Sequence, residues 1–216
     1  MLKVGLTGGV ACGKSTLARL LCDLGAAVCD ADLVVRELYR GGGPGARAVD
    51  ALFGPGLLAA DGGVDRAALA GLVLADPTAR RRLEEAVHPL VRDWITAWLG
   101  PLEHGPEPPA VAVVEAALLV ETGYWRDYHR VVVVTAAAPV RRARALASGW
   151  DPRAFERVLA AQADDAAREK VADYVVVNAG DEAALKAVAE RLWQTLLEDA
   201  GLLAAGKPLP PRRITF

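Results

Sequence analysis

Short apolar runs and longer segments with helical periodicity alternate along the 216 residues of the chain. A short, near-continuous apolar run is typical of a strand that is covered on both faces, as in a parallel sheet. Five segments have this character: residues 2–6, 27–30, 110–115, 130–135 and 174–177. The pattern therefore predicts a parallel sheet of buried strands.

Helical signals lie between the predicted strands. Residues 14–24 follow the first strand directly, while Asp76-Pro77 and Asp151-Pro152 each combine an N-cap residue with a first-turn proline. They predict helices from residue 77 toward Trp98 and over residues 153–163. The buried face of a last helix is predicted from residues at spacings of three and four: Leu185, Val188, Leu192 and Leu196. Strand alternating with helix predicts an α/β fold of three layers.

Two segments depart from this alternation. Residues 41–100 contain helical patterns without a convincing strand, and residues 139–170 are helical and rich in arginine. The core of a single domain spanning residues 1–200 is expected from the other stretches: residues 1–40, 110–138 and 171–200. Residues 201–216 form a proline-rich tail that we expect to pack loosely, if at all.

Composition narrows the class of protein. Hydrophobic residues make up 53% of the chain and charged residues 24%, which is too apolar for a disordered protein. The net charge of −2 argues against a generally basic surface, so we expect no nucleic-acid partner. No apolar run approaches the roughly 18 residues of a membrane span, so we expect no membrane partner. The three cysteines form no CxxC pair, which indicates a reduced, cytoplasmic protein.

The segment Gly8–Ser15 satisfies the phosphate-loop motif G-x-x-x-x-G-K-S/T, with a predicted strand before it and a helix after it. Glycines allow backbone N–H groups to point at phosphate oxygens, and the helix dipole favours an anion at this end. Lys14 is expected to reach the β- and γ-phosphates, and the Ser15 hydroxyl to bind Mg²⁺. We expect the ATP-binding residues of this segment to be Gly8, Gly9, Ala11, Cys12, Gly13, Lys14, Ser15 and Thr16. Cys12 fills a small position; a redox role at the helix N-terminus is the alternative.

An acidic pair follows the second predicted strand as Asp30-Ala31-Asp32. A carboxylate at this edge of a parallel sheet can accept the proton of an attacking hydroxyl or hold Mg²⁺ through water. Either residue could instead cap the next helix, and Asp32 is the preferred candidate base. Glu115 ends a strand that resembles a Walker-B strand, which is a weak signal alone. Neither an NKxD motif of GTPases nor an LSGGQ motif of ABC-type ATPases occurs.

Several motifs together resemble the dephospho-CoA kinase family. Beyond the phosphate loop and Asp30-Ala31-Asp32, the resemblance rests on short motifs spread as far as residue 180: Asp65-Arg66, His88-Pro89, Leu118-Leu119-Val120-Glu121, Ala160-Ala161-Gln162 and Asn178-Ala179-Gly180. The resemblance implies a P-loop NTPase core with a helical acceptor-binding subdomain at about residues 41–100 and a helical lid at about 139–170. It also implies transfer of the ATP γ-phosphoryl group to the ribose 3′-hydroxyl of dephospho-CoA, with Mg²⁺ as cofactor.

The resemblance also implies roles for individual residues. Asp32 corresponds to the general base, while Arg66 and His88 are candidate contacts of the acceptor; His88 could instead cap or kink its helix. Asn178 is a candidate ATP contact. Among the lid arginines, Arg141 and Arg144 are the candidate catalytic residues beside Lys14 and Asp32. The alternative for the lid arginines is a solvated helix face paired with Asp151 and Glu156, and we expect two or three of them to lie only at the surface.

The chain departs from the family pattern at specific positions. Ala117 stands where the family commonly has proline, and Val177 stands where an acid is common. Residues 147–150, Ala-Ser-Gly-Trp, replace a usual Arg-Asp pair, which leaves open which of Arg141, Arg142 and Arg144 does its work. Alternative functions are another small-molecule P-loop kinase and a nucleotide-sensing switch that transfers nothing. We expect a monomer or a weak homo-oligomer.

Overall fold

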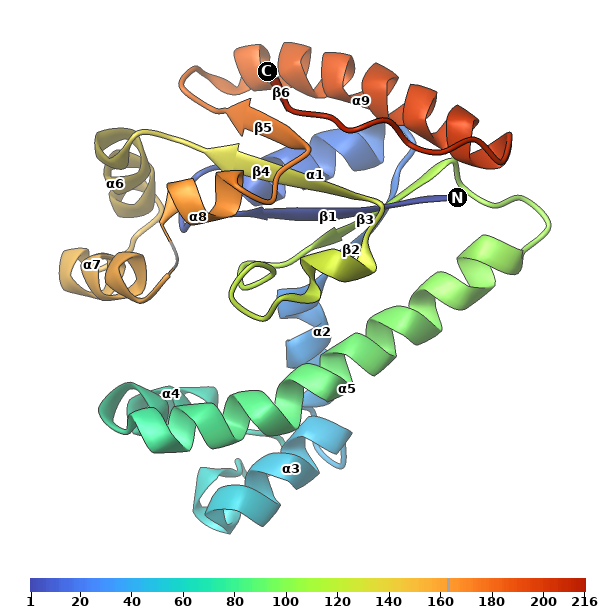
Figure 1. Cartoon of the computed structure of the whole chain (residues 1–216). Helices are drawn as coiled ribbons and strands as arrows, with labels where there is room; N and C mark the ends of the chain where they lie inside the picture. Colours follow the sequence, from blue (N-terminus) through green and yellow to red (C-terminus); the bar gives the residue numbers. More distant parts are fainter. Residues whose placement is uncertain (163) are drawn as a thin grey trace. The chain divides into compact units, whose positions relative to one another are not determined.

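The computed structural model, which describes residues 1–162 and 164–216, contains a six-stranded sheet (Figure 1). Its strands lie in the order β2-β3-β1-β4-β5-β6. Their bounds are Leu2–Gly8 for β1, Ala27–Asp30 for β2, Val111–Glu115 for β3, Arg130–Thr135 for β4, Tyr174–Val177 for β5 and Ile214–Thr215 for β6. β1 pairs in parallel with β3 and β4, and β4 and β5 continue the parallel pairing. The predicted α/β class with a parallel sheet is confirmed.

The chain divides into two compact units, of which the first comprises Met1–Cys29 and Gly105–Phe216. Its helices are α1 (Lys14–Asp23), α6 (Ala138–Ala147), α7 (Pro152–Ala161), α8 (Asp165–Glu169), α9 (Glu182–Ala204) and the short 3₁₀ helix η2 (Tyr124–Asp127). Ala163, the last residue of the helix predicted over 153–163, lies outside the described residues. α1 and α9 pack against each other and against β1 and β3, so they cover the same face of the sheet (Figure 1).

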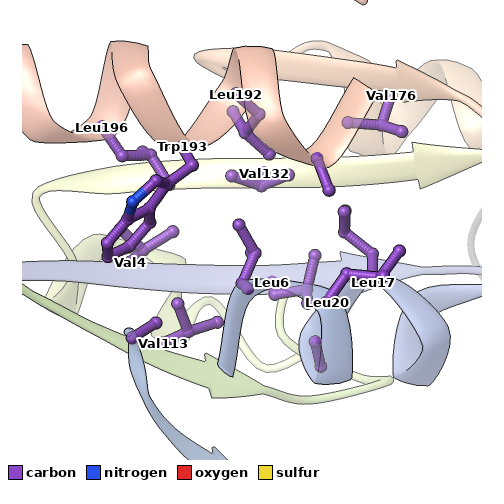
Figure 2. Close-up of a cluster of buried hydrophobic side chains, with 14 of the residues drawn as sticks. Val4, Leu6, Leu17, Leu20, Val113, Val132, Val176, Leu192, Trp193 and Leu196 are labelled. Atoms are coloured by element: carbon purple, nitrogen blue, oxygen red, sulfur yellow. The ribbon is translucent and has the colours of Figure 1, made fainter. Parts of the chain in front are cut away.

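Alternation along β4 divides its valines between the two faces of the sheet. Val132 and Val134 belong to the cluster that contains α1 and α9, whereas Val131 and Val133 pack with Ala172 in a separate cluster. Figure 2 shows the larger cluster, in which side chains of the sheet meet those of the two helices: Val4, Leu6, Val113, Val132 and Val176 with Leu17, Leu20, Leu192, Trp193 and Leu196. The helical stripe predicted in α9 is confirmed, because its three leucines are buried and Val188 packs against the cluster.

The second unit, Asp30–His104, is helical apart from one isolated bridge between Leu58 and Val64 among its described residues. Its helices are α2 (Ala31–Leu38), α3 (Pro44–Phe53), η1 (Pro55–Leu57), α4 (Arg66–Ala75) and α5 (Pro77–His104). Ala46, Val49, Val64 and Leu69 form a small core of its own. The helix predicted from residue 77 toward Trp98 is present and continues to His104 through two internal prolines.

The C-terminal tail is ordered against the sheet, so the expectation of loose packing was wrong. α9 extends to Ala204, and the last residues add β6 in parallel to β5. The Phe216 N–H donates to Val175 O at 2.8 Å, and the Phe216 ring lies 6.1 Å from the ring of Tyr174. A strand of two residues carries too little periodicity to be predicted from a proline-rich sequence.

Buried charged side chains near the amino end of β4 hold the C-terminal tail in place. Arg130, at the start of β4, donates from Nε to Asp199 Oδ2 at 2.6 Å and from Nη2 to Pro210 O at 2.8 Å. The Tyr174 hydroxyl donates to the same Asp199 oxygen, and Arg212 Nη2 donates to Oδ1 at 3.3 Å. Burial alone would raise the pKa of Asp199, but its bonds to Arg130 and Tyr174 and the charge of Arg130 lower it. Asp199 is therefore the ionised acceptor that joins α9, the sheet and the tail.

Replacement of Asp199 by asparagine should destabilise the protein strongly, because it removes the fully buried counter-charge of Arg130 and leaves only the partly exposed Asp173. Breaking a buried pair in this way costs about 3–5 kcal/mol of unfolding free energy. The neighbouring Glu198 is the matched control, since its side chain is 68% exposed and pairs with Arg212 at 3.6 Å. Glu198→Gln should change stability by less than about 1 kcal/mol. Urea unfolding of both variants measures the difference, and equal losses would contradict the role of Asp199.

Candidate functional site

The segment Gly8–Ser15 leaves β1 and enters α1 as a tight loop. Ala11 adopts a positive φ of 57°, and Gly13, the N-cap residue of α1, has a φ of 97°. No side chain among the described residues caps the N-terminus of α1. The first N–H groups of a helix lack partners within the helix, and they suit an anion such as phosphate. The loop therefore has the backbone form that the motif predicted.

Close approach of two side chains explains the glycines at positions 9 and 13. A Cβ atom at Gly9 would lie 2.1 Å from Nη2 of Arg141, and one at Gly13 would lie 2.2 Å from Nδ2 of Asn178. Real Cβ atoms do not approach other heavy atoms this closely. The glycines thus allow side chains from α6 and from the end of β5 to lie against the loop.

Glu115 holds both functional side chains at the start of α1. Ser15 Oγ donates to Glu115 Oε1 at 2.6 Å, and Lys14 Nζ lies 3.5 Å from the same oxygen. Glu115 ends β3, next to β1 in the sheet, and is 6% exposed. The sequence offered only a weak signal for this residue, a strand that ends in a carboxylate, and the structure places it in the site.

Arg141 reaches the loop from α6. Its Nε donates to Val10 O at 2.8 Å, and its Nη1 lies 3.5 Å from Asp165 Oδ2. The side chain is buried, and its Nη2 has no hydrogen-bond partner among the described residues. The Val10 N–H donates to Gln162 Oε1 at 2.8 Å, so residues from both ends of the arginine-rich segment hold the loop. Gln162 was noticed in the Ala160-Ala161-Gln162 motif but was not predicted as a site residue.

Arg144 and Asn178 fasten the other side of the loop. Asn178 Nδ2 donates to Cys12 O at 2.9 Å. Arg144 Nη2 donates to Asn178 Oδ1 at 3.1 Å and to Gly180 O at 2.9 Å. The structure thus brings Arg141, Arg144 and Asn178 together around the loop. The side-chain amide of Asn178 bonds the loop backbone and so supports the loop.

Cys12 lies inside this arrangement with 1% of its surface exposed. Burial raises the pKa of its thiol above the ordinary value, against an opposing effect of the Lys14 charge. A raised pKa keeps the thiol protonated, which favours the small-residue interpretation of Cys12 over the redox alternative.

A cavity of about 530 Å³ opens beside the loop within the first unit. Residues 9–16 line one part of it, and side chains and backbone beyond the loop line the rest: Arg144, Ala145, Ser148, Trp150, Asn178, Gly180, Asp181, Glu182 and Leu185. Every predicted ATP-binding residue except Gly8 is among the lining residues, and Gly8 ends β1 beside them. Trp150, Asp181 and Glu182 were missed, because no motif connects them with the loop. Gly180 belongs to the Asn178-Ala179-Gly180 motif but was not predicted as a site residue.

Three other arginines of the segment, Arg142, Arg153 and Arg157, lie at the surface, whereas Arg168 is fully buried and pairs with Glu121 at 2.9 Å. Arg142 pairs with Glu156 at 3.4 Å, and both side chains are more than half exposed. Arg153 and Arg157 are also exposed on α7. The expectation that two or three of these arginines lie only at the surface is confirmed.

Comparison with known proteins identifies the family. A sequence model described as dephospho-CoA kinase matches residues 2–203. The chain belongs to the dephospho-CoA kinase family. This confirms the resemblance derived from the motifs and makes the chain an ATP-dependent kinase rather than a nucleotide-sensing switch.

Individual relatives cover nearly the whole chain. The dephospho-CoA kinase of Moorella thermoacetica is 42% identical over 197 residues, 91% of this chain and 92% of that relative. The enzyme of the same name from Thiobacillus denitrificans is 43% identical over 202 residues, 91% of this chain and 96% of that relative. A crystal structure of a Thermus thermophilus protein is 30% identical, covers 91% of this chain and 96% of its own, and superposes with a TM-score of 0.72.

The acidic pair that resembles the family motif is divided between two tasks. Asp30 is the N-cap of α2, and its Oδ1 accepts from the N–H groups of Asp32 at 2.8 Å and Leu33 at 3.3 Å. Asp32 lies exposed in the first turn of α2. Asp30 thus caps the N-terminus of α2, and Asp32 is left as the candidate base.

The other two family-derived candidates lie elsewhere in the second unit. Arg66 is the exposed first residue of α4, and its charge opposes the burial that raises the pKa of Tyr39. His88 is half-buried inside α5, so it does not cap that helix. Burial lowers the pKa of His88, against an opposing effect of Glu84, and favours its neutral form.

Two kinds of feature are absent from residues 1–162 and 164–216. No helix among them is both long enough and apolar enough to cross a membrane. They also contain no group of three or more His, Cys, Asp or Glu side chains placed to hold a metal ion.

Gly9→Ala should weaken ATP binding by about fivefold, because the new methyl group would push the guanidinium of Arg141 away from the loop. Since the displaced group is the end of a flexible side chain, the cost lies near the lower end of the about 1–3 kcal/mol typical of overpacking. Gly201→Ala is the matched control, since a Cβ there meets no atom within 4 Å. Calorimetric titration with Mg-ATP measures both affinities, and an unchanged affinity in Gly9→Ala would show that the contact with Arg141 is unimportant.

Proposed function

We propose that the protein transfers the γ-phosphoryl group of ATP to the ribose 3′-hydroxyl of dephospho-CoA, giving coenzyme A and ADP. The observation that carries the proposal is the loop Gly8–Ser15 with Lys14, Ser15 and Arg141 gathered on it in a member of the dephospho-CoA kinase family. Phosphoryl transfer needs little covalent chemistry from the protein, so catalysis consists mainly of positioning and charge stabilisation. The site supplies both.

The loop and Lys14 bind the triphosphate in this proposal. The uncapped N-terminus of α1 presents N–H groups to phosphate oxygens, and the helix dipole favours their charge. The Lys14 ammonium lies against Glu115 at 3.5 Å and is 13% exposed. A phosphate can replace the carboxylate as its partner, because the flexible lysine stem turns easily.

The residues around Ser15 fit Mg²⁺. Mg²⁺ prefers oxygen ligands, is usually held by one or two protein groups, and takes its other ligands from phosphates and water. The Ser15 hydroxyl and the Glu115 carboxylate lie 2.6 Å apart and supply such a pair. When bound, the ion neutralises charge on the β- and γ-phosphates. Ser15 would be its direct ligand, and Glu115 orients Ser15.

Arg141 and Arg144 supply the remaining positive charge. Nη2 of Arg141, without a partner among the described residues and beside Gly9, is available to an oxygen of the transferred phosphoryl group. Arg144 is fastened to Asn178 and Gly180 and forms part of the cavity wall. Both belong to residues 139–170, which we assign as the lid that closes over ATP and excludes water.

Residues 41–100 would bind the acceptor, with Arg66 and His88 among its contacts. Arg66 offers a fixed positive charge to the phosphates of dephospho-CoA, and a neutral His88 offers a hydrogen-bonding ring. Asp32 accepts the proton of the 3′-hydroxyl as that oxygen attacks the γ-phosphorus.

The proposal is tested by incubating the purified protein with Mg-ATP and a panel of acceptors: dephospho-CoA, adenosine, AMP, shikimate and gluconate. ADP release and product mass should show one phosphate added to dephospho-CoA and none to the other compounds. Chelation of Mg²⁺ with EDTA should abolish the transfer. Phosphorylation of a different acceptor, with dephospho-CoA unchanged, would overturn the proposal.

Asp32→Asn should reduce kcat by about 10²–10⁴-fold, the usual contribution of a general base, while the Kd for ATP stays within about twofold. Asp30→Asn is the matched control, because asparagine caps a helix about as well as aspartate. It removes a neighbouring negative charge and should keep near-normal kcat. The general-base assignment is wrong if both variants retain turnover or if both lose it equally.

A further inference from the structure

Trp150 is a large aromatic residue that lines the nucleotide cavity and is not explained by packing. It is 39% exposed, whereas Leu192 and Leu196 in the core are fully buried. Ala145, Ser148 and Leu185 also line this cavity. An exposed indole on a cavity wall offers a flat apolar face to a ligand.

The backbone holds Trp150 in place through the way α6 ends. Gly149 adopts a left-handed conformation with a φ of 82°. The Trp150 N–H donates to Ala145 O at 3.1 Å, and the Gly149 N–H donates to Leu146 O at 3.0 Å. These two bonds and the left-handed glycine form a Schellman motif. The residue after the glycine is thus fixed relative to α6, and that residue is Trp150.

The phosphate loop, residues 9–16, supplies one part of the cavity lining, and residues beyond the loop supply a second part. The polar residues of the second part include Asn178, Asp181 and Glu182. Trp150 and Leu185 contribute to the second part, together with Arg144, whose guanidinium is fastened to Asn178 and Gly180. A nucleotide triphosphate combines a polyanionic end with a flat aromatic base, so its two ends match the two parts of the cavity.

We propose that Trp150 is the surface on which the adenine of ATP stacks, while the loop Gly8–Ser15 holds the triphosphate. This inference rests on the proposed function for its choice of ATP as the nucleotide. Stacking on an aromatic side chain tolerates any base, so Trp150 contributes affinity rather than discrimination among bases.

Titration calorimetry with Mg-ATP and with Mg-tripolyphosphate tests the proposal, because tripolyphosphate occupies the loop without offering a base. Trp150→Leu should weaken ATP binding by about 5- to 150-fold, the usual range for loss of one base stack. Its affinity for tripolyphosphate should stay within about twofold of the wild type. Trp150→Phe retains an aromatic face and should recover most of the ATP affinity.

Trp94→Leu is the matched control for removing an exposed tryptophan, since Trp94 is 37% exposed and does not line the cavity. It should leave the affinity for ATP unchanged. Intrinsic fluorescence gives a second measurement: ATP should quench the wild type and Trp94→Leu, and this change should disappear in Trp150→Leu.

Two results would overturn the inference. One is an unchanged ATP affinity in Trp150→Leu; the other is an equal loss for ATP and tripolyphosphate, which would assign Trp150 to support of the loop. These outcomes are independent of the acceptor. A wild-type protein that binds ATP through Trp150 but leaves dephospho-CoA unchanged would contradict the proposed function alone, and normal transfer without stacking would contradict this inference alone.

Discussion

The structure depends on a loop whose backbone is held from outside so that its N–H groups can face a phosphate. Side chains fasten its carbonyl groups: Arg141 bonds Val10 O, and Asn178 bonds Cys12 O. Such fastening fixes the loop before a ligand arrives, which reduces the entropy lost on binding. It also explains the glycines, because the fastening side chains lie where a Cβ would be. The loop, α6 and the end of β5 therefore constrain one another.

Buried arginines at the two ends of β4 show how the same residue type serves stability and function. At the amino end, Arg130 is surrounded by Asp199, Asp173 and Pro210 O, so its donors are engaged and its charge is balanced. Beyond the carboxyl end, Arg141 has one carbonyl bond and a longer contact with Asp165. A buried cation with spare donors is costly in an isolated protein, but it becomes favourable when an anionic substrate supplies the missing charge.

Local sequence signals made most elements of the first unit predictable. Contacts between residues that lie far apart in the sequence could not be predicted in this way. The strands and the phosphate loop follow from apolar runs and one motif, because each is specified within about ten residues. The sequence favoured Asp32 as the base but left open which of Asp30 and Asp32 caps the next helix; the hydrogen bonds of Asp30 decide this. β6 was missed because it is stabilised by backbone pairing with Val175 of β5 and by the hydrogen bond of Arg212 with Asp199, both distant in sequence. Trp150 was missed because it lines the same cavity as residues 9–16, which lie far from it in the sequence.

Helical periodicity supports Arg141 and Arg144, rather than Arg142, as the arginines that would replace the usual Arg-Asp pair at residues 147–150. Arg141 and Arg144 are three residues apart on α6 and therefore share one face, which is the face toward the loop. Arg142 belongs to a different face and pairs with Glu156 at the surface. In the proposed function, Arg144 and the buried Arg141, about one and two turns before residue 148, supply the positive charge of the lid. Residues 148–150 then end α6 and place Trp150 on the cavity wall.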